Sequence, residues 1–296
     1  MGKADRNRQR SARERIAAQQ AAARKAEARR RMFLAFGSVV AVIAIVVVLL
    51  VVKGLQKPAK AAADAASAQT KVTKQITTIP ATTFDSVAKG TASPLVPTKG
   101  TNAILTSGGK PEIVYVGAEY CPYCAAERWA LTAALSRFGT FSNLHYIHSS
   151  STDVYPSTPT LTFYQSTYTS KYVDFQPVEI QGTTEGKALQ TPTAEQSALF
   201  AKWDAPPYVP ANEKGSFPFV DFGNQYLVLG AQYNPQDLSK LTWSQVAADM
   251  ADPSSKVAAD IDSAANSITA AICKITKNAP AAVCTSPAVQ AGEGLL

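Results

Sequence analysis

The feature that most constrains the fold of this chain is an apolar run followed at once by two cysteines and a helix-forming segment. Residues Ile113–Val116 are β-branched or aromatic and follow the turn-forming sequence Gly-Gly-Lys-Pro, which predicts a buried strand. After Cys124 the sequence is rich in helix formers, so we expect a helix that runs to Phe138. Pro122 suits its first turn, because the amide that proline lacks would have no partner there. The helix therefore opens on Cys121 and Cys124.

A helix start changes the chemistry of a cysteine. The unpaired backbone amides and the positive end of the helix dipole favour a thiolate over a thiol. A free cysteine has a pKa of about 8.5, whereas cysteines of Cys-x-x-Cys motifs at helix starts fall to roughly 3.5–7.5. We therefore predict that Cys121 is the attacking nucleophile and that Cys124, one turn further along, is the resolving thiol.

Two other uses of the cysteine pair stay open at this point. A zinc site needs four ligands, and the remaining cysteines, Cys273 and Cys284, do not form a second Cys-x-x-Cys motif. A purely structural disulfide within the motif is the other alternative. The strand, turn and helix around the motif favour redox chemistry over both, and we expect neither a metal nor a cofactor.

The motif carries a resemblance to known proteins. The sequence AEYCPYC after a strand resembles the thioredoxin superfamily, and the tetrad CPYC is typical of glutaredoxins. The longer segments GAEYCPYCAAERWAL, STDVYPSTPT, SFPFVDFGNQY and ITAAICKIT are similar to a membrane-anchored bacterial and archaeal thioredoxin-like family known as a domain of unknown function, DUF929. The similarity spans roughly residues 82–284 and implies an α/β, thioredoxin-like fold preceded by one N-terminal transmembrane helix.

The resemblance also guides the order of elements after the motif. Residues 144–148 predict a second strand. The next stretch, about 150–212, is longer than a minimal thioredoxin requires, so we expect an insertion after the second strand that shapes a substrate groove. Residues 216–230 predict a hairpin, and the apolar side chains of residues 253–277 follow the three-four spacing of a buried helix.

Pro218 opens the predicted hairpin and resembles the cis-proline that packs beside the cysteine pair in thioredoxin-like proteins. Pro159 is its rival, because it lies nearer to the motif in the sequence. Phe217 would offer backbone groups to an extended substrate, in the manner of strand addition. The side chains that we expect to line the substrate groove are Tyr120, Pro122, Tyr123 and Phe217.

Two departures from thioredoxin concern proton transfer. Tyr115 stands where that superfamily carries a buried acid, and Ala125 stands where a lysine often follows the second cysteine. Glu119 and Glu127 are the nearby carboxylates, although we interpret Glu127 as a solvated helix residue. The direction of electron transfer does not follow from these residues, and an oxidising compartment favours an oxidase.

The net charge of +7 arises at one end of the chain. Residues 1–31 hold eleven Lys and Arg against three Asp and Glu, a net of +8, so the rest of the chain sums to −1. Residues Phe33–Val52 are twenty uncharged residues, long enough to cross a hydrocarbon core of about 30 Å. We predict a transmembrane helix over residues 32–53, with the basic tail in the cytoplasm. A signal peptide is the alternative, but the apolar run is longer than its h-region.

Beyond the membrane, residues 54–80 are small and polar and predict a flexible tether. We expect the extracytoplasmic domain to span residues 81–290. Cys273 and Cys284 are predicted to form a structural disulfide, since only this pairing, together with that of Cys121 and Cys124, is local. Closing a loop of this length contributes roughly 3 kcal/mol in the chain-entropy model.

The sequence as a whole predicts a single-pass protein of the cell membrane whose outer domain is a thiol-disulfide oxidoreductase. Its substrates would be thiol-containing proteins, and the resemblance implies a membrane quinone-linked disulfide generator as partner. The alternative is a redox-inert binding or scaffold module of the cell envelope, in which the Cys-x-x-Cys motif is a structural disulfide. The basic tail carries no aromatic or docking motif, so we expect no nucleic-acid partner.

Overall fold

The computed structural model describes residues 65–296. The predicted basic tail, the predicted transmembrane helix and the first part of the predicted tether lie outside the described residues. Between residues 65 and 296, no helix combines the length and the apolar character that a membrane span requires. The chain from Ser67 onward forms one compact α/β unit.

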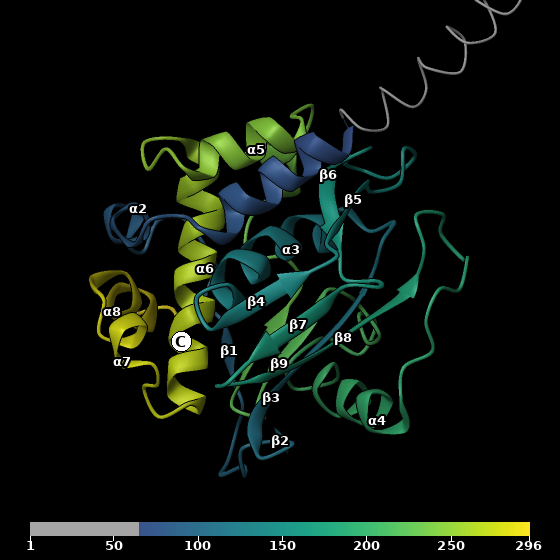
Figure 1. The fold of residues 1–296 in the computed structure, drawn as a ribbon. Helices are drawn as coiled ribbons and strands as arrows, with labels where there is room; N and C mark the ends of the chain where they lie inside the picture. The colour runs from purple at the N-terminus through teal and green to yellow at the C-terminus, as the bar shows by residue number, and fades with distance from the viewer. Residues whose placement is uncertain (1–64) are drawn as a thin grey trace, which may run out of the picture. The chain divides into compact units, whose positions relative to one another are not determined.

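A six-stranded mixed sheet organises this unit (Figure 1). Its strands are β1 (Val96–Pro97), β2 (Thr106–Ser107), β3 (Lys110–Ala118), β8 (Asp174–Gln181), β9 (Phe219–Phe222) and β10 (Tyr226–Leu229). The order β1-β10-β9-β3 is antiparallel throughout, and β2 also pairs antiparallel with the first residues of β3. The one parallel pairing of this sheet joins β3 to β8. Strand β3 is therefore the centre of the sheet.

The helices cover both faces of the sheet. From residue 81 onward they are α2 (Ala81–Val87), α3 (Pro122–Leu135), α4 (Ala194–Trp203), the 3-10 turn η1 (Pro235–Leu238), α5 (Trp243–Met250), α6 (Lys256–Ile275), α7 (Ala281–Cys284) and α8 (Pro287–Glu293). Side chains of α3 and α6 share the larger core with Tyr115 of β3, whereas Trp203 of α4 packs in a smaller core with Val116. Successive side chains of β3 thus point into opposite cores, as the two-residue period of a strand requires.

Several local predictions are confirmed. Strand β3 and helix α3 form where the sequence placed them, and β9 and β10 form the predicted hairpin. The long C-terminal helix α6 buries the apolar stripe that the spacing indicated. Its members are Val257, Ile261, Ala264, Ile268, Ile272 and Ile275.

The predicted second strand is confirmed, but it lies outside the six-stranded sheet. Strand β5 (His145–His148) forms at that place, but it pairs with β6 (Pro159–Thr162), while β4 (Gly139–Ser142) pairs with β7 (Thr167–Ser170). The parallel partner of β3 is β8, which lies inside the stretch of about 150–212 that we predict as an insertion, so part of this stretch belongs to the central sheet. Strands β4, β5, β6 and β7 therefore lie between β3 and its parallel partner β8 in the chain.

Strand β8 is hard to recognise in the sequence for a physical reason. Pro177 lies in the middle of β8, and a proline lowers the expectation of a strand because it cannot donate to the ladder. Strand β8 pairs only with β3 and so is an edge strand, where a missing amide on the outer side costs no ladder hydrogen bond.

The predicted tether is also wrong in its second half, because residues 65–77 are helical. Val72 and Ile76 are 2% and 1% exposed and belong to the larger core. The hydroxyl of Thr73 shares a hydrogen bond of 2.8 Å with the hydroxyl of Tyr146. Only two large apolar side chains mark the buried face of this helix, which is too short a pattern to reveal a period.

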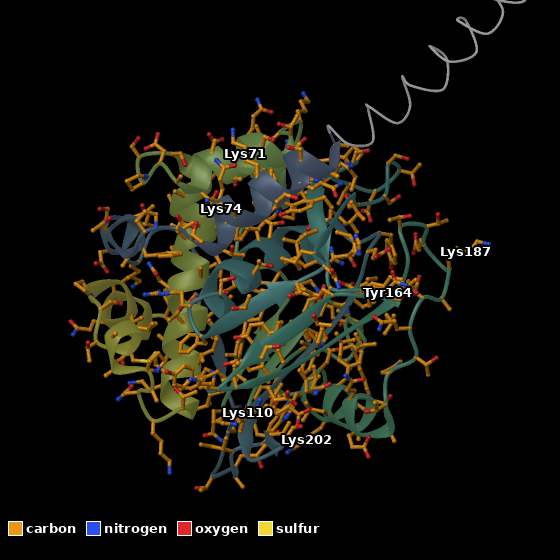
Figure 2. All side chains as sticks on the ribbon, in the orientation of Figure 1. Lys71, Lys74, Lys110, Tyr164, Lys187 and Lys202 are labelled. Carbon is orange, nitrogen blue, oxygen red and sulfur yellow. A yellow bond between two sulfur atoms is a disulfide. The ribbon has the colours of Figure 1, made fainter. Side chains whose placement is uncertain are left out.

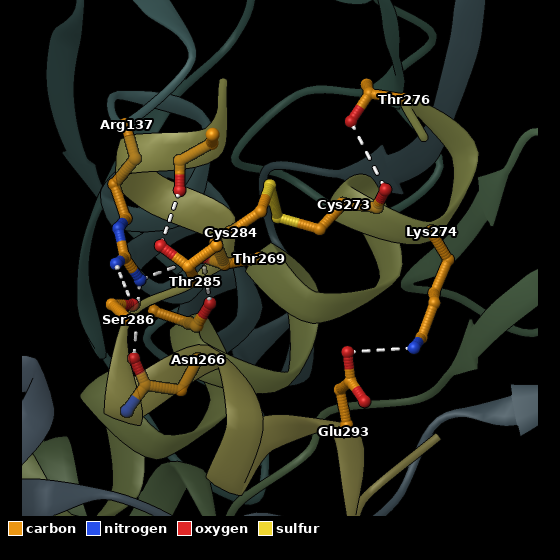
Figure 3. The surroundings of a disulfide bond; sticks show 12 residues. Arg137, Asn266, Thr269, Cys273, Lys274, Thr276, Cys284, Thr285, Ser286 and Glu293 are labelled. Carbon is orange, nitrogen blue, oxygen red and sulfur yellow. Dashed lines mark hydrogen bonds and ion pairs between the residues drawn. A yellow bond between two sulfur atoms is a disulfide. The ribbon is translucent and has the colours of Figure 1, made fainter. Parts of the chain in front are cut away.

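A disulfide joins Cys273 near the end of α6 to Cys284 in α7, the pair that we predicted (Figure 3). The Cα atoms are 5.6 Å apart, and eleven positions separate the two cysteines in the sequence. An ion pair between Lys274 and Glu293 at 2.8 Å also links α6 to α8. That ion pair is at the surface and contributes little to stability. The disulfide is therefore the stronger of the two links at this end of the chain.

We expect the double substitution C273S/C284S to lower the free energy of unfolding by roughly 2–4 kcal/mol, because the unfolded chain gains the freedom of an open loop. Urea unfolding of the wild-type and variant proteins under non-reducing conditions measures this loss. An unchanged unfolding midpoint would show that the disulfide does not constrain the domain.

Candidate redox site

The two cysteines of the motif lie where β3 ends and α3 begins. Cys121 is the N-cap residue of α3, and Pro122 occupies the first turn. The backbone amide of Cys124 donates a hydrogen bond to the Cys121 sulfur at 3.4 Å. One of the otherwise unpaired amides of the helix start is thus directed at that sulfur, which favours its ionised form.

The two thiols differ in access. Both are free thiols in this structure. Cys121 is 6% exposed and lines a surface groove, whereas Cys124 is 0% exposed. The thiol of Cys121 also lies 3.7 Å from the carbonyl oxygen of Phe217, to which it donates. Only Cys121 can therefore be reached by another molecule.

The surroundings of the two thiols also shift their pKa values in opposite directions. A hydrogen bond from the Cys124 thiol lowers the pKa of Cys121, and the Cys124 amide and the positive charge of Arg128 act in the same direction against the effect of burial. Burial raises the pKa of Cys124 well above its ordinary value, and its hydrogen bond to Cys121 raises it further. The accessible thiol is the one that ionises easily, and the buried thiol keeps its proton.

Beneath the cysteines lies a buried ion pair between Arg128 of α3 and Glu179 of β8. Both side chains are 0% exposed, and the contact is bidentate, with Nε and Nη2 each 2.8 Å from a carboxylate oxygen. Nη2 also donates to the carbonyl oxygen of Ala118 at 2.7 Å. The same oxygen accepts the amide of Cys121 at 3.3 Å. The ion pair thus contacts the backbone turn that carries the first cysteine.

This ion pair is not predicted from the sequence, because 51 positions separate Arg128 from Glu179. One signal was available. Arg128 follows Cys124 by four residues, so the two side chains share one face of α3. If Cys124 is the buried thiol, that face points into the protein, and Arg128 then needs a buried acid as partner.

The two nearby carboxylates are both buried. Glu127, which we interpreted as a solvated residue, is 0% exposed: one oxygen accepts the amide of Gln232 at 3.1 Å and the other has no partner. Burial raises the pKa of Glu127 to about 8. Burial also raises the pKa of Glu119, against a hydrogen bond from Thr162. The interpretation of Glu127 as solvated is therefore wrong.

A groove with a volume of about 580 Å³ lies over Cys121. The structure brings the four predicted groove residues to it, namely Tyr120, Pro122, Tyr123 and Phe217. The rings of Tyr120 and Phe217 pack edge to face with their centroids 6.0 Å apart. A substrate that reaches the Cys121 sulfur would contact these aromatic side chains.

The two candidate prolines lie in different places. The Phe217–Pro218 peptide bond is cis and directly precedes β9. Its rival Pro159 begins β6, and the Pro159 carbonyl oxygen accepts the indole N–H of Trp129 at 3.0 Å in the core. Pro218 is therefore next to the residue whose carbonyl group contacts Cys121, and Pro159 packs behind α3.

A metal site is not found in this part of the molecule. Among residues 65–296, no three His, Cys, Asp or Glu side chains gather in an arrangement that could hold a metal ion. The chemistry that the site can perform with its own groups is thiol-disulfide exchange at Cys121, with Cys124 as the second sulfur.

Comparison with known proteins identifies one family. A family model described as a domain of unknown function (DUF929) matches residues 97–209 and 188–274. The matched residues include β3, the cysteine motif, β8 and most of α6. No curated protein and no solved structure matches the chain.

Glu127 predicts a pH dependence of stability. Its carboxyl has an ordinary pKa of 4.5 and a pKa of about 8 in the folded protein, so unfolding releases a proton between these values. Stability should therefore fall as pH rises from about 4.5 to about 8, by at most about 1.4 kcal/mol for each pH unit. The E127Q variant, measured by urea unfolding at pH 5 and pH 8, should lose less stability over this range than the wild type. Parallel profiles would contradict the buried, protonated state of Glu127.

The buried ion pair predicts strong coupling between its members. The R128M variant leaves the carboxylate of Glu179 buried and unpaired, which should cost about 3–5 kcal/mol of unfolding free energy. The E179Q substitution in the R128M background should restore part of that loss, because it removes the uncompensated charge. A double-mutant cycle from urea unfolding measures the coupling. A double variant no more stable than R128M would contradict the pairing.

Proposed function

The chain belongs to the DUF929 family, and we propose that it is a thiol-disulfide oxidoreductase of thioredoxin-like fold that acts through Cys121 and Cys124. The observation that carries this proposal is the asymmetry of the two thiols. Cys121 lines a groove at a helix start and its pKa is lowered, whereas Cys124 is fully buried with a raised pKa. A nucleophilic sulfur and a resolving sulfur need these two environments.

The arrangement of elements supports the thioredoxin-like part of the proposal. Strand β3, helix α3 and the parallel strand β8 make up a strand-helix-strand unit with the Cys-x-x-Cys motif at its first turn. The cis bond before Pro218 lies beside the motif, because the Phe217 carbonyl oxygen is 3.7 Å from the Cys121 sulfur. The resemblance of the sequence to thioredoxin-like proteins rests on these same two segments.

In the oxidising direction, a substrate thiolate attacks the Cys121 sulfur of a Cys121–Cys124 disulfide. The bond between the two cysteines breaks, a mixed disulfide forms with Cys121, and Cys124 leaves as a thiolate that takes up a proton. A second thiolate of the substrate then attacks the substrate sulfur of the mixed disulfide and releases the Cys121 thiolate. Two substrate thiols lose two electrons and the cysteine pair gains them.

The reverse sequence reduces a substrate disulfide and begins with attack by the Cys121 thiolate. The oxidising direction is favoured by the lowered pKa of Cys121, because a stabilised thiolate stabilises the reduced form of the pair. Glu119, whose pKa is raised by burial, lies two residues before Cys121 and is a group that could exchange the proton of Cys124.

We also propose where the protein acts and with what. The twenty uncharged residues Phe33–Val52 would anchor it in the cell membrane, with residues 1–31 in the cytoplasm and the cysteine pair outside. The Cys273–Cys284 disulfide supports this orientation, since structural disulfides persist in oxidising compartments. Its substrates would be thiol-containing proteins, and a membrane quinone-linked disulfide generator would reoxidise the pair.

Substitution of each cysteine tests the proposal. The C121S variant should lose the oxidation of reduced substrate proteins, because no accessible sulfur remains. The C124S variant cannot form the Cys121–Cys124 disulfide, so it should also lose the oxidation of reduced substrates. Its Cys121 thiolate should instead attack substrate disulfides and accumulate as mixed disulfides, since Cys124 is not there to resolve them, and these are visible on non-reducing gels. The cysteine pair of the wild type should have a reduction potential above about −300 mV. Full activity of C121S, or a potential below that value, would instead favour a redox-inert scaffold whose cysteine pair is a structural disulfide.

A further inference from the structure

The groove over Cys121 has an uneven charge. Two of the residues that line it, Asp153 and Glu185, are acidic, and none is a lysine, arginine or histidine. Asp153 lies in the loop of residues 149–158 between β5 and β6, and Glu185 lies in the loop of residues 182–193 between β8 and α4. Two separate loops thus bring negative charge to the same groove.

Both carboxylates act on one groove side chain. Burial raises the pKa of Tyr120 to about 12, and the charges of Glu185 and Asp153 contribute to that rise. The phenol of Tyr120 is adjacent in sequence to Cys121 and lines the groove with it. The negative charge of the two carboxylates therefore acts on the side chain next to the reacting sulfur.

These charges are not compensated by the described part of the chain. No ion pair within residues 65–296 includes Asp153 or Glu185. An oxygen of Asp153 accepts only the neighbouring Val154 amide, at 2.6 Å. Lys187 follows Glu185 by two residues, but Figure 2 shows it at the outer side of its loop, and it does not line the groove. A cationic ligand would supply the missing countercharge.

The groove also offers apolar surface. Tyr123 and Val154 are the two large apolar side chains that remain exposed within residues 65–296, at 40% and 69%, and both line this groove. Apolar surface that is exposed in one place and rimmed by polar residues marks protein interaction sites, and here both exposed side chains border the same groove. Residues 215–217 form another part of the wall, and the carbonyl oxygen of Phe217 contacts Cys121.

We propose that the groove selects an extended segment of a client protein in which lysine or arginine flanks the reacting cysteine, and that it disfavours thiols flanked by acidic groups. The basic side chains of the segment pair with Asp153 and Glu185, and its apolar side chains contact Tyr123 and Val154. This inference rests on the proposed thiol-disulfide exchange at Cys121 and adds the class of substrate.

Matched peptides test this selection with the oxidised full-length protein. Three peptides share one cysteine and one length, and the residues on both sides of the cysteine are lysine, glutamine or glutamate. The second-order rate constant with which excess peptide reduces the Cys121–Cys124 disulfide is measured in a single turnover, at low salt and at 0.5 M salt. Each protein disulfide that is reduced oxidises two peptide thiols to one peptide disulfide. Each rate is divided by that of the same peptide with hydroxyethyl disulfide, because flanking charge also changes the reactivity of the peptide thiol itself.

We expect the lysine peptide to react roughly 3- to 20-fold faster than the glutamate peptide at low salt, with a smaller ratio at high salt because ions screen surface charges. The D153N/E185Q variant should bring the ratio close to one. The D249N/E293Q variant, which makes the same change of charge on α5 and α8 outside the groove, should keep the wild-type ratio.

Two results would overturn the inference: equal normalised rates for the three peptides with the wild type, or an undiminished ratio in D153N/E185Q. A third result concerns the proposed function instead. If the wild type oxidises none of the peptides and behaves as C121S does, thiol-disulfide exchange itself is refuted. The two failures are therefore distinguishable in one set of assays.

Discussion

The bidentate ion pair between Arg128 and Glu179 is the contact on which the site depends. Two buried charges cost desolvation energy, which the close bidentate contact and the further hydrogen bond of Nη2 offset, although Nη1 of Arg128 is buried without a partner. Here the pair joins α3 to β8, and its third hydrogen bond holds the carbonyl oxygen of Ala118 at the end of β3. Three elements therefore meet at one guanidinium group directly beneath the cysteines. The same positive charge lowers the pKa of Cys121, so one interaction serves both the architecture and the chemistry.

Around this pair, the two cysteines acquire different properties from ordinary helix geometry. At the N-cap position, the Cys121 sulfur accepts a hydrogen bond from a backbone amide and lines the groove. Cys124, one turn further along, is buried in the core. Loops that are distant in sequence build the groove, with Asp153 before β6 and Phe217 before β9. The central sheet thus fixes the sulfur atoms, and the loops determine which molecules can reach them.

The parts of the fold that follow from the sequence are those encoded over short distances. A β-branched run predicted β3, a proline after the first cysteine predicted the start of α3, and three-four spacing predicted α6. The parts that do not follow depend on distant pairing. Pro177 makes the edge strand β8 hard to recognise in the sequence, and the partner of Arg128, Glu179, lies 51 residues away. Glu127 is buried against the segment before η1, whose Gln232 amide donates to its carboxylate across 105 positions, and no local pattern records that contact.

The ionisation of Cys121 tests this account most directly. The rate at which iodoacetamide alkylates the reduced protein, followed from pH 4 to pH 10 and assigned by mass spectrometry of the modified peptide, reports the thiolate at each cysteine. We predict a midpoint for Cys121 clearly below the value of about 8.5 of a free cysteine, with Cys124 unmodified in the folded protein. A midpoint at or above that value, or alkylation of Cys124 before Cys121, would contradict the account.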